Sequence, residues 1–159
     1  MNGERGEFFR SFKGLRQGDP LSPLLFNLVA DALSAMLSRA NNVGLIHGLV
    51  PNLVDGGLTH LQYTDDTVLL LKFNPVNLRN VRLILSCYEA MSGMKINFDK
   101  SEVFTVGLTE AEQQTVAASL SCKLGAFPMK YLGMPVSDCK ISKAHLRYVG
   151  DKTEKRLST

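Results

Sequence analysis

The sequence has few of the features that mark a secreted, disulfide-linked or membrane-spanning protein. It has three cysteines, and no two of them form a C-x-x-C pair. They are Cys87, Cys122 and Cys139. This predicts neither a disulfide framework nor a zinc site. No apolar signal region stands near Met1, and no stretch approaches the ~20 apolar residues of a membrane span. We therefore expect an intracellular protein with reduced, mostly buried thiols and no membrane partner, and leave nucleus or cytoplasm open.

Strong net charge is also missing. The 159 residues carry 18 Lys+Arg and 15 Asp+Glu, a formal charge of +3, which alone does not imply a nucleic-acid partner. Apolar residues make up 45% and charged residues 21%, which is typical of a soluble globular domain. The charge is uneven, because residues 123–159 hold eight basic and three acidic residues. Two interpretations fit this tail: a solvated helix face, or a segment that follows a phosphate backbone.

The pattern of apolar and turn residues predicts a mixed α+β chain with an antiparallel sheet and helices packed on one face. Strands or extended runs are expected over residues 7–13, 58–64, 67–73, 95–106 and 129–136. Helices are expected to begin after the caps Ser22, Asn74, Thr109 and Ser142.

The first helix is expected to run to about Arg39 and to carry a polar stripe on an otherwise apolar, buried surface. The stripe consists of Asn27, Asp31, Ser34 and Ser38. The second helix is expected to end at Gly93 and to bury Leu78, Val81, Leu85 and Tyr88.

Asp65-Asp66 separates two β-rich runs, so it predicts the loop of a β-hairpin. Two adjacent carboxylates also form a hard anionic oxygen site that suits Mg²⁺ and phosphoryl or nucleotidyl transfer. A complete two-metal centre needs a further carboxylate from another segment. On its own, the pair fits a plain turn as well as a metal site.

The segment from Gly14 to Pro23, G-L-R-Q-G-D-P-L-S-P, combines flexible backbone with polar side chains before a helix. Arg16 can pair with phosphate, Gln17 can donate and accept hydrogen bonds, and a helix N-terminus offers N–H groups to an anion. An ordinary loop before a well-capped helix explains the same residues.

Together these motifs resemble a reverse transcriptase, and more narrowly the LINE-type non-LTR retrotransposon enzymes of plants. The R-Q-G segment is followed by Y-T-D-D at 63–66, S-G-M-K-I-N-F-D-K-S-E at 92–102 and K-Y-L-G-M-P-V at 130–136. The last two are similar to the family's next palm motif and to its primer grip. The resemblance implies a partial polymerase palm over residues 1–141 and the start of a thumb helix over 142–159.

Carried over residue by residue, the resemblance implies roles for several side chains. Asp65 would bind both catalytic Mg²⁺ ions, and Asp66 would be a secondary ligand. Arg16, Gln17 and Gly18 would lie against the incoming nucleotide and the template. Lys100, with Lys95 as its competitor, would approach the pyrophosphate, although a solvated surface charge explains either lysine. Tyr131, Leu132 and Gly133 would form the primer grip, which is compatible with a packed strand. The implied partners are an RNA template, a DNA primer and deoxynucleoside triphosphates.

The sequence departs from the family at one decisive position. No residue matches the family's first metal-binding aspartate, because the only acids before Arg16 are Glu4 and Glu7, in a segment that resembles the hairpin between the two motifs. The 159 residues also contain no segment that resembles the family's fingers or an endonuclease domain. Thr64 stands where these elements often have alanine. We therefore expect the 159 residues alone to be an inactive polymerase. We also expect an uncovered sheet edge to make them either poorly stable or self-associating. The alternatives are a nucleic-acid-binding or interaction module, or a retroelement remnant without function.

Overall fold

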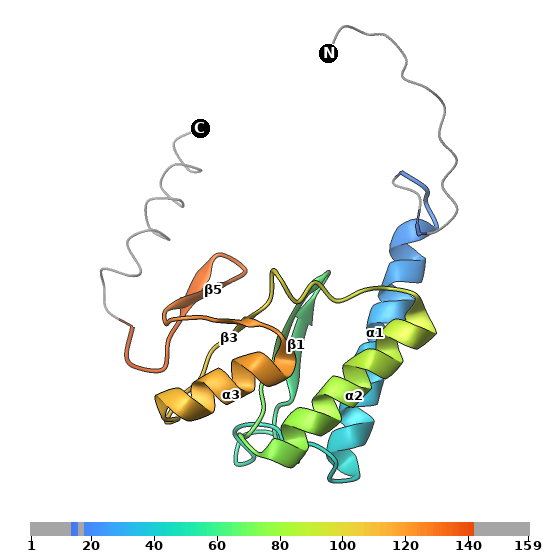
Figure 1. Cartoon of the computed structure of the whole chain (residues 1–159). Coiled ribbons are helices and arrows are strands. Elements are labelled where there is room, and N and C mark those ends of the chain that lie inside the picture. Colours follow the sequence, from blue (N-terminus) through green and yellow to red (C-terminus); the bar gives the residue numbers. More distant parts are fainter. Residues whose placement is uncertain (1–13, 16–17, 142–159) are drawn as a thin grey trace, which may run out of the picture. The chain divides into compact units, whose positions relative to one another are not determined.

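The computed structural model describes residues 14–15 and 18–141 (Figure 1). In these residues the elements are α1 (Ser22–Asn42), β1 (His60–Tyr63), β2 (Asp66–Leu69), α2 (Pro75–Ser92), β3 (Glu102–Val103), α3 (Glu110–Leu120), β4 (Lys123–Leu124), β5 (Met129–Tyr131) and β6 (Met134–Val136). This confirms the α+β class. The strand expected over 7–13 and the helix expected after Ser142 lie outside the described residues.

The chain divides after Met94 into two compact units, each of which is described by itself. In the first unit, α1 and α2 lie side by side and α1 also packs on β1 (Figure 1). Leu37, Ile46 and Val81 are fully buried. Burial of each such side chain stabilises a fold by about 1.5–3 kcal/mol, so these three are the main apolar support of this unit. The predicted domain boundary at 141/142 stays a prediction.

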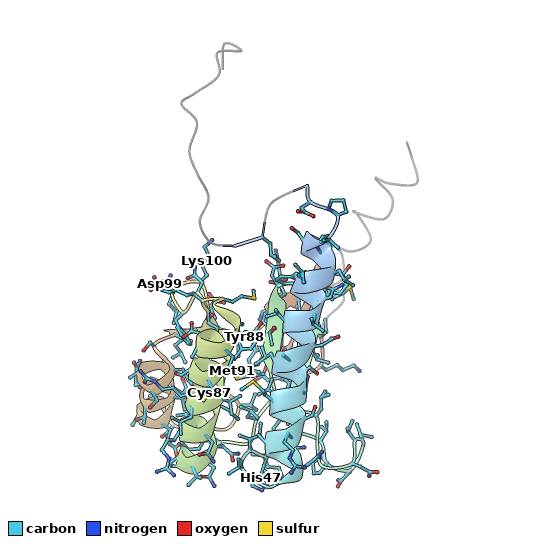
Figure 2. The ribbon with its side chains drawn as sticks, turned by 90° about the vertical axis from the view of Figure 1, so that its right-hand side faces the viewer. His47, Cys87, Tyr88, Met91, Asp99 and Lys100 are labelled. Carbon is cyan, nitrogen blue, oxygen red and sulfur yellow. The ribbon has the colours of Figure 1, made fainter. Side chains whose placement is uncertain are left out.

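The second helix follows its sequence signals closely. The Asn74 side chain accepts a 2.8 Å hydrogen bond from the backbone N–H of Val76, which confirms the predicted cap. Gly93 ends the helix in the left-handed conformation, with φ of 70°. Val81, Leu85 and Tyr88 are buried as predicted, and Tyr88 lies on the α1 side of α2 (Figure 2). Leu78, in contrast, is half-buried, and Asn77 is the further buried residue on this face.

The first helix differs from its prediction in two respects. Ser22 is its first residue, and the N-cap position is Leu21, whose backbone N–H donates to Asp19 Oδ1 at 2.9 Å. The helix was also expected to be buried outside its polar stripe, but Leu24 and Leu28 are 66% and 67% exposed. The buried positions of this helix, Leu33, Leu37 and Ala40, all lie in its C-terminal half.

The expected single antiparallel sheet is replaced, in the described residues, by three two-stranded sheets. The β1–β2 and β5–β6 pairs are antiparallel, whereas β3 and β4 run parallel. The strand expected over 95–106 is reduced to Glu102–Val103, because a turn interrupts it. In that turn the backbone N–H of Lys100 donates to Asn97 Oδ1, and the Ser101 hydroxyl donates to the backbone carbonyl oxygen of Asn97.

The second unit is organised around α3 and a small aromatic contact. Thr109 and Glu112 form the predicted capping box, with each side chain bonded to the other residue's backbone N–H. The rings of Phe104 and Phe127 lie 5.4 Å apart between centroids. A Cβ on Gly125 would stand 2.6 Å from the Phe104 ring, so a larger residue there would require that ring to move.

The cysteines are less buried than predicted. Cys87 and Cys139 are exposed, and Cys122 is half-buried with its pKa raised by burial. Cys87 is an exposed residue of α2 (Figure 2). No helix in the described part of the chain has the length and apolar character that a membrane span requires.

Candidate functional site

The tip of the β1–β2 hairpin carries the paired carboxylates. Tyr63 pairs with Asp66, so the two-residue loop is Thr64-Asp65 and not the predicted Asp65-Asp66. Pairing along the whole strand sets this register, because a shift by one residue would turn every side chain to the opposite face. Thr64 occupies the left-handed region with φ of 52°, and its hydroxyl donates to Asp65 Oδ1 at 3.0 Å.

Both carboxylates are exposed and therefore accessible to a ligand. Asp65 lies in the loop, and Asp66 is the first residue of β2. Their hard oxygen atoms suit Mg²⁺ in chemistry and charge. In the part of the chain that the structure describes, no group of three or more His, Cys, Asp or Glu side chains is placed to hold a metal ion. The pair fits a magnesium site in kind, but a full ligand set needs at least one further carboxylate.

The backbone conformation of the loop before α1 requires a glycine at position 18. Gly18 has φ of 88°, a region that L side chains rarely adopt, and it is exposed. The neighbouring candidates Arg16 and Gln17 lie outside the described residues. Their assignment to nucleotide and template contacts stays a prediction.

An open cavity of about 520 Å³ lies between α1 and β1, close to the hairpin tip. Three of the four residues of the predicted polar stripe of α1 line it, together with residues of β1 and its loop. The lining consists of Asn27, Ala30, Asp31, Ser34, His60, Leu61, Gln62 and Thr64. The stripe was predicted from its helical spacing, and the structure shows that it faces this cavity.

His60 connects the hairpin to α1. Its Nε2 lies 2.7 Å from Ser34 Oγ, and its Nδ1 lies 2.9 Å from Thr59 Oγ1. Burial lowers the pKa of His60 below its ordinary value of 6.5. The imidazole is therefore neutral at pH 7, with one nitrogen as donor and the other as acceptor, and hydroxyl groups can serve both.

The remaining candidates belong to the second unit. Lys95 and Lys100 are both exposed, and Figure 2 shows Lys100 beside Asp99 in the turn that follows Asn97.

The predicted primer-grip residues lie at the tip of the β5–β6 hairpin, where Tyr131 pairs with Met134 and Leu132 and Gly133 form the turn. Leu132 and Gly133 both have positive φ, 51° and 80°. Leu132 is 51% exposed, so an apolar side chain stands at this tip in an unfavourable backbone conformation.

Comparison with known proteins agrees with these motifs. The family model described as reverse transcriptase (RNA-dependent DNA polymerase) matches residues 1–136. The chain belongs to the reverse transcriptase family. The match spans the R-Q-G segment, both hairpin tips and the turn that carries Lys100.

This reverse transcriptase segment has relatives in the Pol polyproteins of retrotransposable elements. It is 31% identical over 150 residues, 84% of this chain, to the Pol polyprotein of an R2-type retrotransposable element of Drosophila melanogaster. It is 34% identical over 94 residues, 59% of this chain, to the corresponding polyprotein of Popillia japonica. It is 39% identical over 67 residues, 42% of this chain, to an uncharacterized mitochondrial protein of Arabidopsis thaliana.

The chain spans only part of each relative. It covers 13% of the Drosophila polyprotein, 12% of the Popillia polyprotein and 55% of the Arabidopsis protein. Two of these relatives are Pol polyproteins of retrotransposable elements, and none of the three singles out a plant LINE-type element.

Sequence reasoning found the two carboxylates of this reverse transcriptase segment but missed the cavity beside them. The missed residues are His60, Gln62 and Thr64. The sequence did contain a signal for the cavity. His60 and Gln62 are two positions apart in a predicted strand and therefore share one polar face, and the polar stripe of α1 is a surface that such a face can meet. Only the packing of α1 on β1 shows that the two polar surfaces meet.

Proposed function

We propose that this chain forms the carboxylate-bearing part of a palm that catalyses RNA-directed DNA synthesis. The single observation that carries the proposal is the exposed Asp65-Asp66 pair at a hairpin tip, within a segment that belongs to the reverse transcriptase family. Nucleotidyl transfer needs accessible carboxylates of this kind to hold its metal ions.

In this proposal Asp65 is the principal Mg²⁺ ligand and Asp66 a secondary one. Bound Mg²⁺ would activate the attacking hydroxyl and stabilise the leaving pyrophosphate. The Thr64 hydroxyl, which donates to Asp65 Oδ1, orients the Asp65 carboxylate and leaves its second oxygen for a ligand. A template, a primer and deoxynucleoside triphosphates are the corresponding partners.

The other sequence candidates take supporting roles. Arg16, Gln17 and Gly18 would contact the incoming nucleotide and the template base. Lys100 would approach the pyrophosphate, and the exposed Leu132 would lie against the end of the primer.

The 159 residues by themselves are expected to be inactive. No residue in them matches the family's upstream metal-binding aspartate. Loss of one ligand of such a charge-stabilising centre costs several kcal/mol of transition-state stabilisation, or several decades of rate. Two adjacent carboxylates are still expected to bind a single divalent ion weakly.

The test combines two measurements on the folded 159-residue chain. Mn²⁺ titration, followed by electron paramagnetic resonance, is expected to show one weak site that Asp65→Asn removes. Primer extension on an RNA template with Mg²⁺ is expected to give no product. Asp55→Asn, which neutralises an exposed aspartate of the same unit outside the β1–β2 hairpin, is the matched control and keeps the ion.

Two results would change the proposal in different ways. Extension by the unmodified chain that Asp65→Asn abolishes would confirm polymerase function and disprove the expected inactivity. Mn²⁺ binding that is the same in the unmodified chain and in Asp65→Asn would remove Asp65 from the proposed metal site and sink the assignment.

A second candidate function is nucleic-acid binding without catalysis. Residues 123–159 carry a net charge of +5, from eight basic and three acidic residues, and Lys123 and Lys140 in the described part of this segment are exposed. A basic segment contributes to sequence-independent affinity by neutralising phosphates. This candidate requires the tail and does not require Asp65.

A further inference from the structure

The cavity between α1 and β1 holds a serine and a histidine in direct contact. Ser34 Oγ of α1 lies 2.7 Å from His60 Nε2 of β1, and both residues line the cavity, which is open and measures about 520 Å³. On the other side of the ring, His60 Nδ1 lies 2.9 Å from Thr59 Oγ1. An accessible hydroxyl, an imidazole and a second hydroxyl therefore stand in one row. The carboxylate chemistry of Asp65 and Asp66 uses none of these groups.

Such a row has the geometry of a nucleophile activated by a base. A serine hydroxyl becomes reactive when a neighbouring imidazole takes its proton, with the imidazole held in place by a third group. With its own proton on Nδ1, His60 donates to Thr59 Oγ1 and accepts the Ser34 hydroxyl at Nε2. Thr59 is 5% exposed, so packing holds its hydroxyl against the ring.

The protonation state of His60 agrees with this geometry. Burial lowers the pKa of His60 below 6.5, so the ring is neutral at pH 7 and one nitrogen can accept a proton. Ser34 belongs to a helix and His60 to a strand that pack on each other, which fixes the two side chains better than mobile loops would.

Other lining side chains suit the binding of an acyl group. In the described part of the chain, the side chains of Asn27 and Gln62 make no hydrogen bond to another protein group, so their N–H groups can donate to a carbonyl oxygen. Such donors stabilise the negative charge that this oxygen gains when the carbonyl is attacked. The lining contains no Lys or Arg and includes the carboxylate of Asp31, so it disfavours an anionic substrate.

We propose that Ser34 and His60 form a second reactive site, which hydrolyses small neutral or cationic esters through an acyl-serine. Ser34 Oγ bonds to the acyl carbon while its proton passes to His60 Nε2. The ester C–O bond then breaks, and the alcohol leaves with that proton. Water attacks the acyl-serine in the same way, giving its proton to His60, and Ser34 regains a proton as the carboxylic acid leaves. Water is the only co-reactant, and Asp65 and Asp66 take no part.

The first experiment labels the full 159-residue chain with a fluorophosphonate, which reacts with serines that an imidazole activates. Mass spectrometry is expected to locate the adduct on Ser34. His60→Gln is expected to slow labelling by about a hundredfold. Ser38→Ala is the matched control, because Ser38 lies on the same stripe of α1 without lining the cavity, and it is expected to leave labelling unchanged. No adduct on Ser34, or equal labelling in His60→Gln, would overturn the inference.

The second experiment follows turnover of p-nitrophenyl acetate, a small neutral ester. The chain is expected to release one equivalent of p-nitrophenol in a burst, and Ser34→Ala, which keeps the imidazole, is expected to abolish it. The burst rate is expected to fall as the pH drops below 6.5 through the pKa of His60, because a protonated ring cannot accept the serine proton. A burst that survives in Ser34→Ala, or a rate without this inflection, would contradict the proposal.

Nitrogen-15 NMR of the His60 ring gives a test that needs no variant. The proton is expected on Nδ1, whereas a proton on Nε2 would mean that His60 donates to Ser34 and that their contact is structural, which overturns the inference. A chelator is present in all three measurements. A failure of primer extension or of Mn²⁺ binding at Asp65 is therefore distinguishable from a failure of this site.

Discussion

At the scale of single residues, four non-glycine positions in the described part of the chain have positive φ, and two of them lie at the hairpin tips that carry candidate function. The other two are Val50 and Ser121. Thr64 and Leu132 both adopt positive φ, near 50°, although neither is glycine. The left-handed region costs such residues roughly 1–2 kcal/mol each. Thr64 gains the hydrogen bond to Asp65 in return, whereas Leu132 is 51% exposed and gains little burial. Strain of this kind without a packing reason is typical of ligand-contacting positions.

The first prediction concerns Leu132→Asn. Asparagine tolerates positive φ better than leucine, so the variant is expected to be more stable by about 1 kcal/mol in urea denaturation. Its affinity for a primer–template is expected to fall, because the exposed apolar contact is lost. Leu53→Asn is the control, since Leu53 is 83% exposed in ordinary backbone and is expected to leave stability unchanged. A destabilised Leu132→Asn would contradict the strain argument.

The second prediction is a pH dependence from His60. Burial holds the pKa of His60 below the 6.5 of the unfolded chain, so the unfolded state binds the proton more tightly. This contribution to stability is therefore complete above about pH 6.5 and is lost as the pH falls through 6.5 towards the folded pKa. Urea midpoints at about pH 7.5 and about pH 5.5 measure the loss.

His60→Gln is expected to reduce that difference between the two midpoints, while His47→Gln is expected to leave the His60 contribution in place. If His60→Gln lost as much stability between the two pH values as the unmodified chain does, the burial of His60 would not be the cause of the pH dependence.

At the scale of elements, local sequence signals decide the helix ends where side chains reach the backbone. Asn74, Gly93 and the Thr109–Glu112 pair all act as predicted. The Thr109 backbone N–H and hydroxyl lower the pKa of Glu112, which favours its charged form near the N-terminus of α3. Ser22 does not act as the cap because it is the first residue of α1, and Leu21 at the N-cap position forms no side-chain cap hydrogen bond.

The third prediction tests the capping box. Thr109→Ala removes the side-chain oxygen that accepts the Glu112 N–H and is expected to cost about 1 kcal/mol. Thr115→Ala is the control within the same helix, since its hydroxyl bonds back to the Ala111 carbonyl and alanine is the better helix former. Thermal unfolding followed by circular dichroism of both variants measures the difference. Equal losses of stability would refute the capping role.

At the scale of the whole molecule, carboxylates and basic residues are separated along the chain. Residues 1–122 carry a net charge of −2 and residues 123–159 a net charge of +5. A polymerase palm needs carboxylates for metal ions and basic residues for phosphates, and this arrangement supplies them from different segments. The basic segment is the feature on which binding without catalysis depends.

The fourth prediction concerns salt. Charge reversal of Lys143, Arg147 and Lys155 is expected to weaken single-strand binding and to reduce the slope of log affinity against log salt by roughly two, at about 0.7 per phosphate. Reversal of three exposed basic residues of the first unit changes the net charge equally and serves as the control. These residues are Arg39, Lys72 and Arg79. A salt-independent affinity, or equal effects of the two triple variants, would contradict binding through the tail.

The sequence alone determined the family, the mixed class and most local structure. The motifs around Gly18, Asp65, Lys100 and Leu132 are contiguous, so they are readable without a fold. Helix caps are local as well, because their hydrogen bonds join residues two or three positions apart. The third helix was therefore predictable, whereas the single extended run expected over 129–136 is in fact the β5–β6 hairpin, with Leu132 and Gly133 at its turn.

Tertiary structure decided what depends on segments distant in the chain. Hairpin register placed the loop at Thr64-Asp65, because strand pairing outweighs the turn preference of two aspartates. Leu24 and Leu28 of α1 stay exposed, since the buried positions of this helix all lie in its C-terminal half. The polar cavity also arises from contact between residues 27–34 and 60–64, which helical and strand periodicity describe only separately. Burial and pairing are properties of the packed chain, and a linear pattern fixes which face is polar but not what that face meets.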